Sequence, residues 1–383
     1  MCDILKHTTM KTGDKTMKKI HRTLSLFTVA AICTALLCSC GDVPDSSQTD
    51  SSSKAATTTT ADTTADTTTT GETSSTASAT SAPDSSVSDS SSAVTDDTKT
   101  NGITPAMWKV ISPEGNTMVM LGSFHALKDE CYPLPEAVTN AYNNADILAV
   151  ECDITSTSED GEYMKNLMKQ MLYNDNTKLS QHISEEAYSA LQTYLGYWGM
   201  DISALEVYRP WAVSSTLDTL LIQDSDFDTE KGLDNFLLTT AHADGKEIYE
   251  VESVDFQMNM LINFSDDIYD LMFRSYEGET KESQKQALED LYTAWKSGDI
   301  ETFLEEDNEE ELAGYTEEDK KIAEDYNNQM LYDRNKNMAK AAEDLMSQGK
   351  NVFYVVGAAH YAGEGGIIDL LEKDGYTAER VQY

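Results

Sequence analysis

The chain has 383 residues, with 28 Lys and Arg against 67 Asp and Glu, so its formal net charge at pH 7 is -39. This acidity argues against nucleic acid or anionic lipid as a partner, because phosphate groups would be repelled. Four of the six cysteines lie at or before Cys40, so the sequence offers no disulfide framework. Cys131 and Cys152 remain, and their spacing alone does not decide whether they pair.

Residues 1–40 have the pattern of a bacterial signal segment. A basic stretch follows Met17, which we take as the true start, and an apolar run extends from Leu24 to Leu37. That run is shorter than the about 20 apolar residues of a membrane-spanning helix. Leu37-Cys38-Ser39-Cys40 resembles a lipobox. We therefore expect a secreted protein with a lipid on Cys40, held at the outer face of the bacterial cytoplasmic membrane by this lipid only.

Residues 41–101 consist almost entirely of Ser, Thr, Ala and Asp. Such a segment cannot bury enough apolar surface to offset its conformational entropy. We expect it to form a disordered tether between the anchor and the rest of the chain. Roughly 280 residues remain in the segment 102–383, enough for one large domain with a substantial core.

The first elements of this domain predict a sheet. Residues 108–111 and 117–121 flank Pro113-Glu114-Gly115-Asn116, which is the pattern of a β-hairpin. A helix over 135–144 and an apolar strand over 147–153 follow. A strand, a helix and another strand within so short a segment indicate a βαβ unit with parallel pairing.

The middle of the domain is dominated by helical periodicity, interrupted by a short strand at 248–251. Long acidic helices are expected from about Phe264 to Ser347. Strand 352–356, helix 367–373 and strand 378–381 then predict a last βαβ-like unit. The predicted fold is α/β, with a mostly parallel central sheet, flanking helices and a large helical insertion.

Two Gly-x-x-His tetrapeptides, Gly122-Ser123-Phe124-His125 and Gly357-Ala358-Ala359-His360, each follow a predicted buried strand. Strand ends are where an α/β sheet delivers side chains into a ligand crevice. Gly122 and Gly357 would let the backbone turn sharply or come close to another group. The matched settings predict one site lined by both histidines; the alternative is that each histidine only makes local hydrogen bonds.

Glu151 ends the strand that follows the first tetrapeptide. With His125 and His360 it forms a set that can hold a divalent cation or position a water molecule. Asp153 lies two residues further and could assist. The alternative for Glu151 is a salt bridge to Arg209 or Arg334.

Further polar residues stand at predicted element ends. Arg209 and Arg334 are scarce cations, suited to a substrate carboxylate or a developing oxyanion; they could equally hold Glu151 or Glu252 in place. Glu252 is a second acidic strand end. Asp234, in Gly232-Leu233-Asp234, is placed to cap a helix.

The segment from Ile103 to Tyr383 resembles the TraB/GumN family, which includes the Tiki-type proteins. The resemblance rests on an ordered set of motifs: Leu121-Gly122-Ser123-Phe124-His125, Leu148-Ala149-Val150-Glu151, Arg209-Pro210-Trp211, Gly232-Leu233-Asp234, Val251-Glu252, Gln257, Arg334-Asn335 and Val356-Gly357-Ala358-Ala359-His360. It implies a fold similar to those of erythromycin esterase and the haem-binding ChaN-like proteins. It also implies a site made of the two histidines and the strand-end glutamate. Tiki-type proteins are described as metal-dependent proteases.

We therefore expect a metal-assisted hydrolase that acts on peptide or ester bonds, with a peptide or a small molecule as its substrate. His125, Glu151 and His360 would bind manganese, cobalt or zinc, and Arg209 or Arg334 would steady an oxyanion. The alternative is a non-catalytic protein that captures a peptide signal, haem or a metal. The sequence leaves the substrate, the metal and the oligomeric state open.

Overall fold

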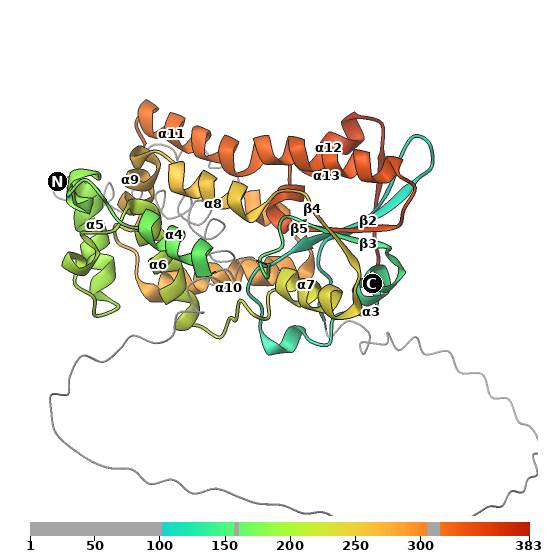
Figure 1. Ribbon diagram of the computed structural model, residues 1–383, viewed down its shortest axis with the longest axis horizontal. Helices are drawn as coiled ribbons and strands as arrows, with labels where there is room; N and C mark the ends of the chain where they lie inside the picture. Colours follow the sequence, from blue (N-terminus) through green and yellow to red (C-terminus); the bar gives the residue numbers. More distant parts are fainter. Residues whose placement is uncertain (1–101, 157–160, 305–314) are drawn as a thin grey trace, which may run out of the picture. The chain divides into compact units, whose positions relative to one another are not determined.

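The computed structural model describes residues 102–156, 161–304 and 315–383. The predicted signal segment 1–40, with its lipidation site Cys40, and the predicted tether 41–101 lie outside the described residues. The described part is a mixed α/β structure built on a six-stranded sheet (Figure 1). Of the helices in these ranges, none is long and apolar enough to cross a membrane.

The sheet has the strand order β4-β3-β5-β2-β1-β6. Its strands are β1 (Met107–Ile111), β2 (Thr117–Ser123), β3 (Ile147–Val150), β4 (Glu247–Glu250), β5 (Val352–Gly357) and β6 (Thr377–Arg380). The inner strands β3 and β5 are buried along their whole length. Parallel strands covered on both faces read as continuous apolar runs, which explains their sequences.

The sheet is mixed, so the prediction of a mostly parallel sheet is wrong. Strands β4, β3, β5 and β2 are parallel neighbours, whereas β1 is antiparallel to both β2 and β6. The turn between β1 and β2 is far shorter than the crossover of about a dozen residues that parallel neighbours need. The last strand, β6, pairs with β1 and not with β5, so the predicted final βαβ unit does not form.

Helices fill the long segment between β3 and β5 and flank the sheet. Their bounds are α3 (Glu136–Asn144), α4 (Gly161–Gln170), α5 (Glu185–Gly196), α6 (Pro210–Gln223), α7 (Leu233–Asp244), α8 (Val254–Asn263), α9 (Asp266–Arg274), α10 (Lys281–Ser297), α11 (Glu317–Asn327), α12 (Asp333–Ser347) and α13 (Ile367–Lys373). In Figure 1, helices α4, α5, α6 and α9 gather at the end of this unit away from the sheet. The predicted large helical insertion is therefore present.

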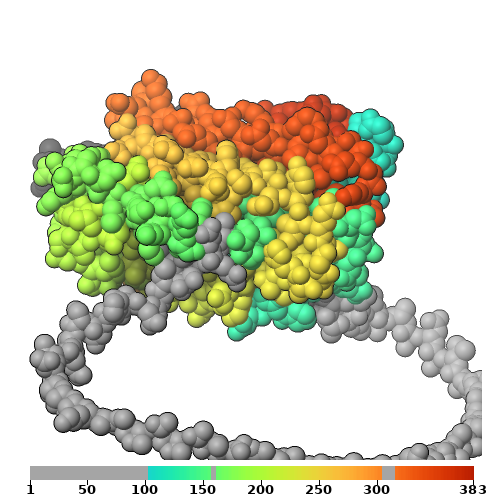
Figure 2. Space-filling view, in the orientation of Figure 1, coloured from blue at the N-terminus to red at the C-terminus, as the bar shows by residue number. Residues whose placement is uncertain are grey.

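Helix α12 continues directly from α11 through a π-helical turn at Asn328–Tyr332. Figures 1 and 2 show this long helical rod, drawn in orange, lying alongside the yellow α8. A buried ion pair joins the two elements, since Arg334 of α12 contacts Glu252, just before α8. The rod thus passes the carboxyl ends of the parallel strands at Arg334 and continues beside β5, where Tyr354 donates to the carbonyl of Met338.

The two cysteines of this domain are buried and unpaired. The Cys131 thiol lies 3.0 Å from the hydroxyl of Tyr292, and Cys152 donates to the side-chain oxygen of Gln257 over 3.5 Å. Burial raises the pKa of both thiols, which disfavours the reactive thiolate. The two cysteines therefore act as small buried side chains.

Gly232, which precedes α7, packs against the backbone that follows β2. A Cβ atom there would collide with the carbonyl oxygen of His125 and lie 2.7 Å from its carbonyl carbon. We expect Gly232→Ala to lower the free energy of unfolding by about 1–3 kcal/mol or more, because backbone must move. The matched control is Gly196→Ala at the end of α5, where a Cβ meets nothing within 4 Å. Urea denaturation of both variants measures the difference, and equal stability would contradict this packing.

Candidate functional site

Three strands deliver the predicted site residues to one edge of the sheet. Strands β2, β3 and β5 are parallel, so their carboxyl ends open on the same side. His125 lies just beyond β2, Glu151 directly follows β3, and His360 lies in the short 3-10 turn after β5. The structure therefore brings His125, Glu151 and His360 together, as the two tetrapeptides and the acidic strand end predict.

Gly357 marks the point at which the three side chains meet. A Cβ atom on this residue would lie 3.1 Å from Oε1 of Glu151 and 3.6 Å from both Nε2 of His125 and Cδ2 of His360. The backbone of Gly357 has φ -51°, which other residues adopt readily. Close approach, and not a sharp turn, is therefore the reason for glycine here. Gly122 serves the same need, since its Cβ would lie 3.0 Å from Ala358.

Both carboxylate oxygens of Glu151 are hydrogen-bonded. Oε1 accepts the backbone N–H of Gly357 at 2.7 Å and lies 3.7 Å from Nε2 of His360. Oε2 accepts from Arg334 at 2.7 Å and from the side-chain amide of Gln257 at 2.9 Å. Burial opposes the ionised form, but the Arg334 charge, the histidines and the Gly357 N–H together hold the pKa of Glu151 well below its usual range. Glu151 is thus a fixed carboxylate.

Arg334 holds two buried carboxylates at once. Its guanidinium donates to Glu252 at 2.8 and 2.9 Å, to Glu151 at 2.7 Å and to the carbonyl of Met330 at 3.1 Å. The side-chain amide of Gln257 also bridges the two glutamates, at 2.9 and 2.8 Å. These contacts agree with the alternative interpretation, in which Arg334 holds Glu151 and Glu252 in place. The N–H donors named here are engaged with protein groups.

The two histidines share a position but differ in their partners. His125 contacts Asp234 through Nδ1 at 2.8 Å, and His360 contacts Oδ1 of Asn335 through Nδ1 at 2.6 Å. The amide nitrogen of Asn335 donates to the carbonyl of Gly365, which fixes Oδ1 toward His360 and makes Nδ1 of that ring the donor. With Nδ1 engaged in both rings, Nε2 is the nitrogen left for chemistry.

These partners drive the two protonation states apart. Burial opposes the charged form of His125, but the Asp234 carboxylate outweighs it and raises the pKa of His125 to about 9. Burial and the nearby Arg334 charge lower the pKa of His360 to about 3. At neutral pH, His125 is an imidazolium and His360 is neutral with a free lone pair on Nε2. Such a pair is typical of sites that perform acid–base chemistry.

Asp234 does not cap a helix through its side chain. Gly232 occupies the N-cap position of α7, and no side-chain cap bond forms there. The Asp234 carboxylate instead lies in the first turn and accepts from His125. Asn335 and Gln257, which occur in the sequence only as members of the family motifs, complete the hydrogen bonds of the site. Their contacts are long-range, so local spacing gave no signal for them.

Other predicted polar residues lie elsewhere. Arg209 immediately precedes α6 and donates to the carbonyl of Ile262 at 3.2 Å, and it does not line the cavity described below. Asp153 accepts from His242 at 2.8 Å and from Thr155, so it points away from Glu151's partners. The structure therefore gives neither Arg209 nor Asp153 a contact with the three converging residues.

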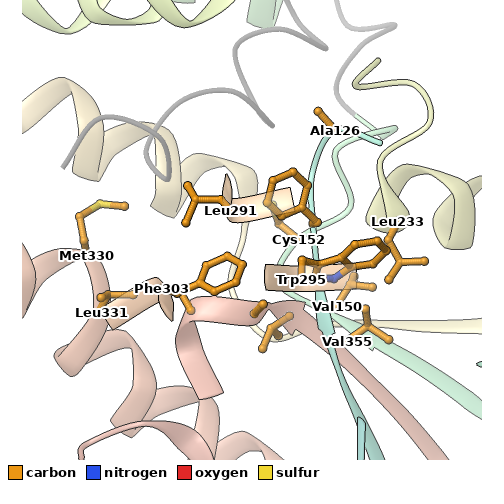
Figure 3. Packing of buried hydrophobic residues seen from close by; sticks show 14 of the residues in the cluster. Ala126, Val150, Cys152, Leu233, Leu291, Trp295, Phe303, Met330, Leu331 and Val355 are labelled. Atoms are coloured by element: carbon orange, nitrogen blue, oxygen red, sulfur yellow. The ribbon is translucent and has the colours of Figure 1, made fainter. Parts of the chain in front are cut away.

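The converging residues form the floor of a cavity. The walls are apolar and come from the helical insertion. They include Leu291 of α10, Phe303 of the short turn Glu301–Leu304, and Met330 of the π-helical turn. Figure 3 shows these three side chains approaching the same region from separate elements. The site is therefore polar at the strand ends and apolar above them.

Within the described ranges, no group of three or more His, Cys, Asp and Glu side chains is arranged to hold a metal ion. Two further features of the site bear on metal binding. The oxygens of Glu151 are occupied by Gly357, Arg334 and Gln257, and His125 carries a proton at neutral pH. The three residues converge without forming a ready-made metal cage.

Removal of the guanidinium should destabilise the fold strongly. We expect Arg334→Met to cost about 3–5 kcal/mol at neutral pH, because two buried carboxylates lose their counter-charge. The folded pKa of Glu151 is depressed, so this stabilisation is present above the ordinary value of 4.5 and is lost as pH falls toward the folded value. Urea titrations across this range should show the penalty shrinking in acid.

The control for this variant is Lys336→Met on the same helix. Lys336 pairs with Asp333, and both side chains are 64% exposed. Exposed pairs contribute about 1 kcal/mol or less. A penalty for Arg334→Met as small as this one would contradict the central role of the buried network.

Replacing the side chain that contacts Nδ1 of each histidine should change the pKa of that histidine. Asp234→Asn should lower the pKa of His125 from about 9 toward 6.5 or below, and Asn335→Asp should raise the pKa of His360 from about 3. In wild type, the raised His125 pKa stabilises the fold below pH 6.5, and this contribution is lost as pH rises through about 9. NMR titration of the imidazole signals in EDTA-treated protein measures both shifts.

A control for these replacements is Asp266→Asn, which removes the carboxylate beside His182, outside the cavity. The titrations of His125 and His360 should not change in this variant. An unchanged His125 titration in Asp234→Asn would show that Asp234 does not set its protonation.

A family model described as the TraB/PrgY/gumN family matches residues 106–380. The uncharacterized protein YbaP of Escherichia coli is 26% identical over 147 residues, which cover 38% of this chain and 52% of YbaP. A metalloprotease TIKI homolog of Nematostella vectensis is 25% identical over 293 residues, covering 65% of this chain and 61% of the relative. Metalloprotease TIKI2 of Danio rerio is 25% identical over 164 residues, covering 38% of this chain and 32% of TIKI2.

The matched segments thus span less than two thirds of the length of each of these relatives. No solved structure matches the chain. The family model covers nearly the whole of the described α/β unit, including both Gly-x-x-His segments, Glu151 and Arg334. The chain therefore belongs to the TraB/PrgY/gumN family.

Proposed function

We propose that this protein is a hydrolase that cleaves peptide or ester bonds with the help of a divalent cation. The observation that carries the proposal is the convergence of His125, Glu151 and His360 around Gly357, at the polar floor of an otherwise apolar cavity. Relatives named as metalloproteases support the hydrolytic reaction and the cation. We further propose a fold related to those of erythromycin esterase and ChaN-like proteins, and a lipid anchor on Cys40 that keeps the domain outside the cell.

The donor set fits a divalent cation in its chemistry. Two imidazole Nε2 atoms and one carboxylate face the same point, and the Nδ1 atoms are fixed by Asp234 and Asn335, as metal-binding histidines require. Nε2 of His360 and Oε1 of Glu151 are 3.7 Å apart, near the roughly 3.4 Å that separates two ligands of one tetrahedral ion. When bound by His125, Glu151 and His360, manganese, cobalt or zinc would polarise a carbonyl and acidify a water molecule.

The chain's own groups would organise the reaction. Arg334 and Gln257 keep Glu151 ionised and fixed in one orientation. Asp234 and Asn335 hold the imidazole rings so that both Nε2 atoms face the floor. The apolar walls exclude bulk water, which strengthens the electrostatic interactions of these groups with a bound substrate. Binding of a cation requires that His125 lose its proton, so the metal affinity should rise with pH up to about 9.

The test uses the full-length protein with each cation in turn, and a panel of peptides and esters. We expect His125→Ala, Glu151→Gln and His360→Ala to lower hydrolysis about a hundredfold or more, and to lower metal content. His242→Ala is the matched control, because His242 also pairs with a buried aspartate, Asp153, but lies outside the cavity. Calorimetric titration with the cation over a range of pH checks the expected rise in affinity.

Two results would count against this function. A protein that binds no cation and hydrolyses nothing in the panel would contradict both parts of the proposal. A ligand captured from culture medium and recovered unchanged after long incubation would instead favour the non-catalytic function of sequestering a peptide signal or haem.

A further inference from the structure

We infer that the substrate carries an uncharged apolar chain next to the bond that is cleaved, and that the helical insertion provides the pocket for this chain. The inference rests on the proposed hydrolytic function and names its substrate class. It follows from where the cavity places its charged and apolar side chains, and from how each charged group is already paired.

The apolar walls are assembled from parts of the chain that are far apart in sequence. Ile222 comes from α6, Met260 from α8, Leu288 and Leu291 from α10, Phe303 from the turn Glu301–Leu304, and Met330 from the π-helical turn. Leu288, Leu291, Phe303 and Met330 are each at least 93% buried, while Met260 is half-buried and lies nearer to solvent. The walls therefore form a defined pocket and not a flat surface.

The charged residues of the cavity all belong to its floor. They are His125, Glu151, Asp234 and Arg334, and the neutral His360 lies beside them; each contacts a protein partner. Among the described residues that line the walls, none carries a charge. An ammonium or carboxylate on the substrate chain would leave water without gaining a counter-charge, which is costly. The pocket should therefore reject charged chains and accept apolar ones.

The walls line the same cavity as the reactive floor, and most of their side chains belong to the buried core on their other faces. Side chains in a protein core contact one another, and an unfilled space forfeits those contacts. Here the space is continuous with Nε2 of His125 and the carboxylate of Glu151. A carbonyl at the floor would direct the chain attached to it along the walls. The acyl chain of an ester and the apolar side chain of a peptide residue both place an apolar group next to a carbonyl.

The experiment measures binding of linear alkanamides, from acetamide to octanamide, to the full-length protein by calorimetry. We expect the affinity to rise about fourfold for each added methylene until the pocket is filled. The octanamide analogue in which an ammonium replaces the terminal methyl should bind no better than acetamide. N-acetyl-leucinamide and N-acetyl-lysinamide form a second arm, and tighter binding of the former than of octanamide would identify a peptide as the source of the chain.

A charge placed on the wall should reverse this preference. Met260→Glu should weaken binding of octanamide and strengthen binding of its ammonium analogue by about tenfold or more. Met168→Glu is the matched control, since Met168 is 41% exposed on α4 and does not line the cavity. It adds the same charge and should change neither affinity. A merely structural role of Met260 would weaken both ligands alike.

The outcomes separate this inference from the proposed function. Equal affinities along the alkanamide series, or no reversal in a folded Met260→Glu protein, would overturn the pocket proposal. Chain-length-dependent binding without hydrolysis of the corresponding esters would support the pocket and contradict the hydrolase. Hydrolysis of short and long esters at equal rates would support the hydrolase and contradict the pocket.

Discussion

The site depends on one buried interaction, the pairing of Arg334 with Glu151 and Glu252. Arg334 is 5% exposed, so neither it nor its partners can rely on water. The guanidinium donates a hydrogen bond to each of the two carboxylates, and the side-chain amide of Gln257 also donates to both. Because removal of one member leaves a buried charge, the network fixes α12 against the ends of β3 and β4. The position of Glu151, and hence of everything around Gly357, follows from it.

The two histidines show how one sequence motif can give two chemical states. Both follow a buried parallel strand, and both contact a polar partner through Nδ1. The partner of His125 is a carboxylate on α7, whereas the partner of His360 is a neutral amide on α12. The Asp234 carboxylate raises the pKa of His125, whereas burial and the nearby Arg334 charge lower the pKa of His360. The asymmetry arises outside the tetrapeptides themselves.

The sheet and the helical insertion contribute different halves of the cavity. Strand ends supply His125, Glu151 and His360, because parallel strands place their carboxyl ends side by side. Asp234 of α7 and Arg334 of α12 then pair with His125 and Glu151. The insertion supplies the apolar walls from elements that meet only after folding. Helices α7, α8 and α12 hold the strand-end residues of the floor through side-chain hydrogen bonds, while the walls line the space above it.

The sequence by itself determined the α/β class, the hairpin, the helical insertion and the convergence of His125, Glu151 and His360, since buried strands and their ends have local patterns. The pairing of β6 with β1 was not predictable in this way, because the partner of β6 is chosen by a free strand edge and not by local sequence. Only the tertiary structure decided this pairing, the partners of the histidines and the place of Arg209. A hydrogen bond between residues 183 positions apart, such as that of Arg334 with Glu151, leaves no periodic signal in the chain.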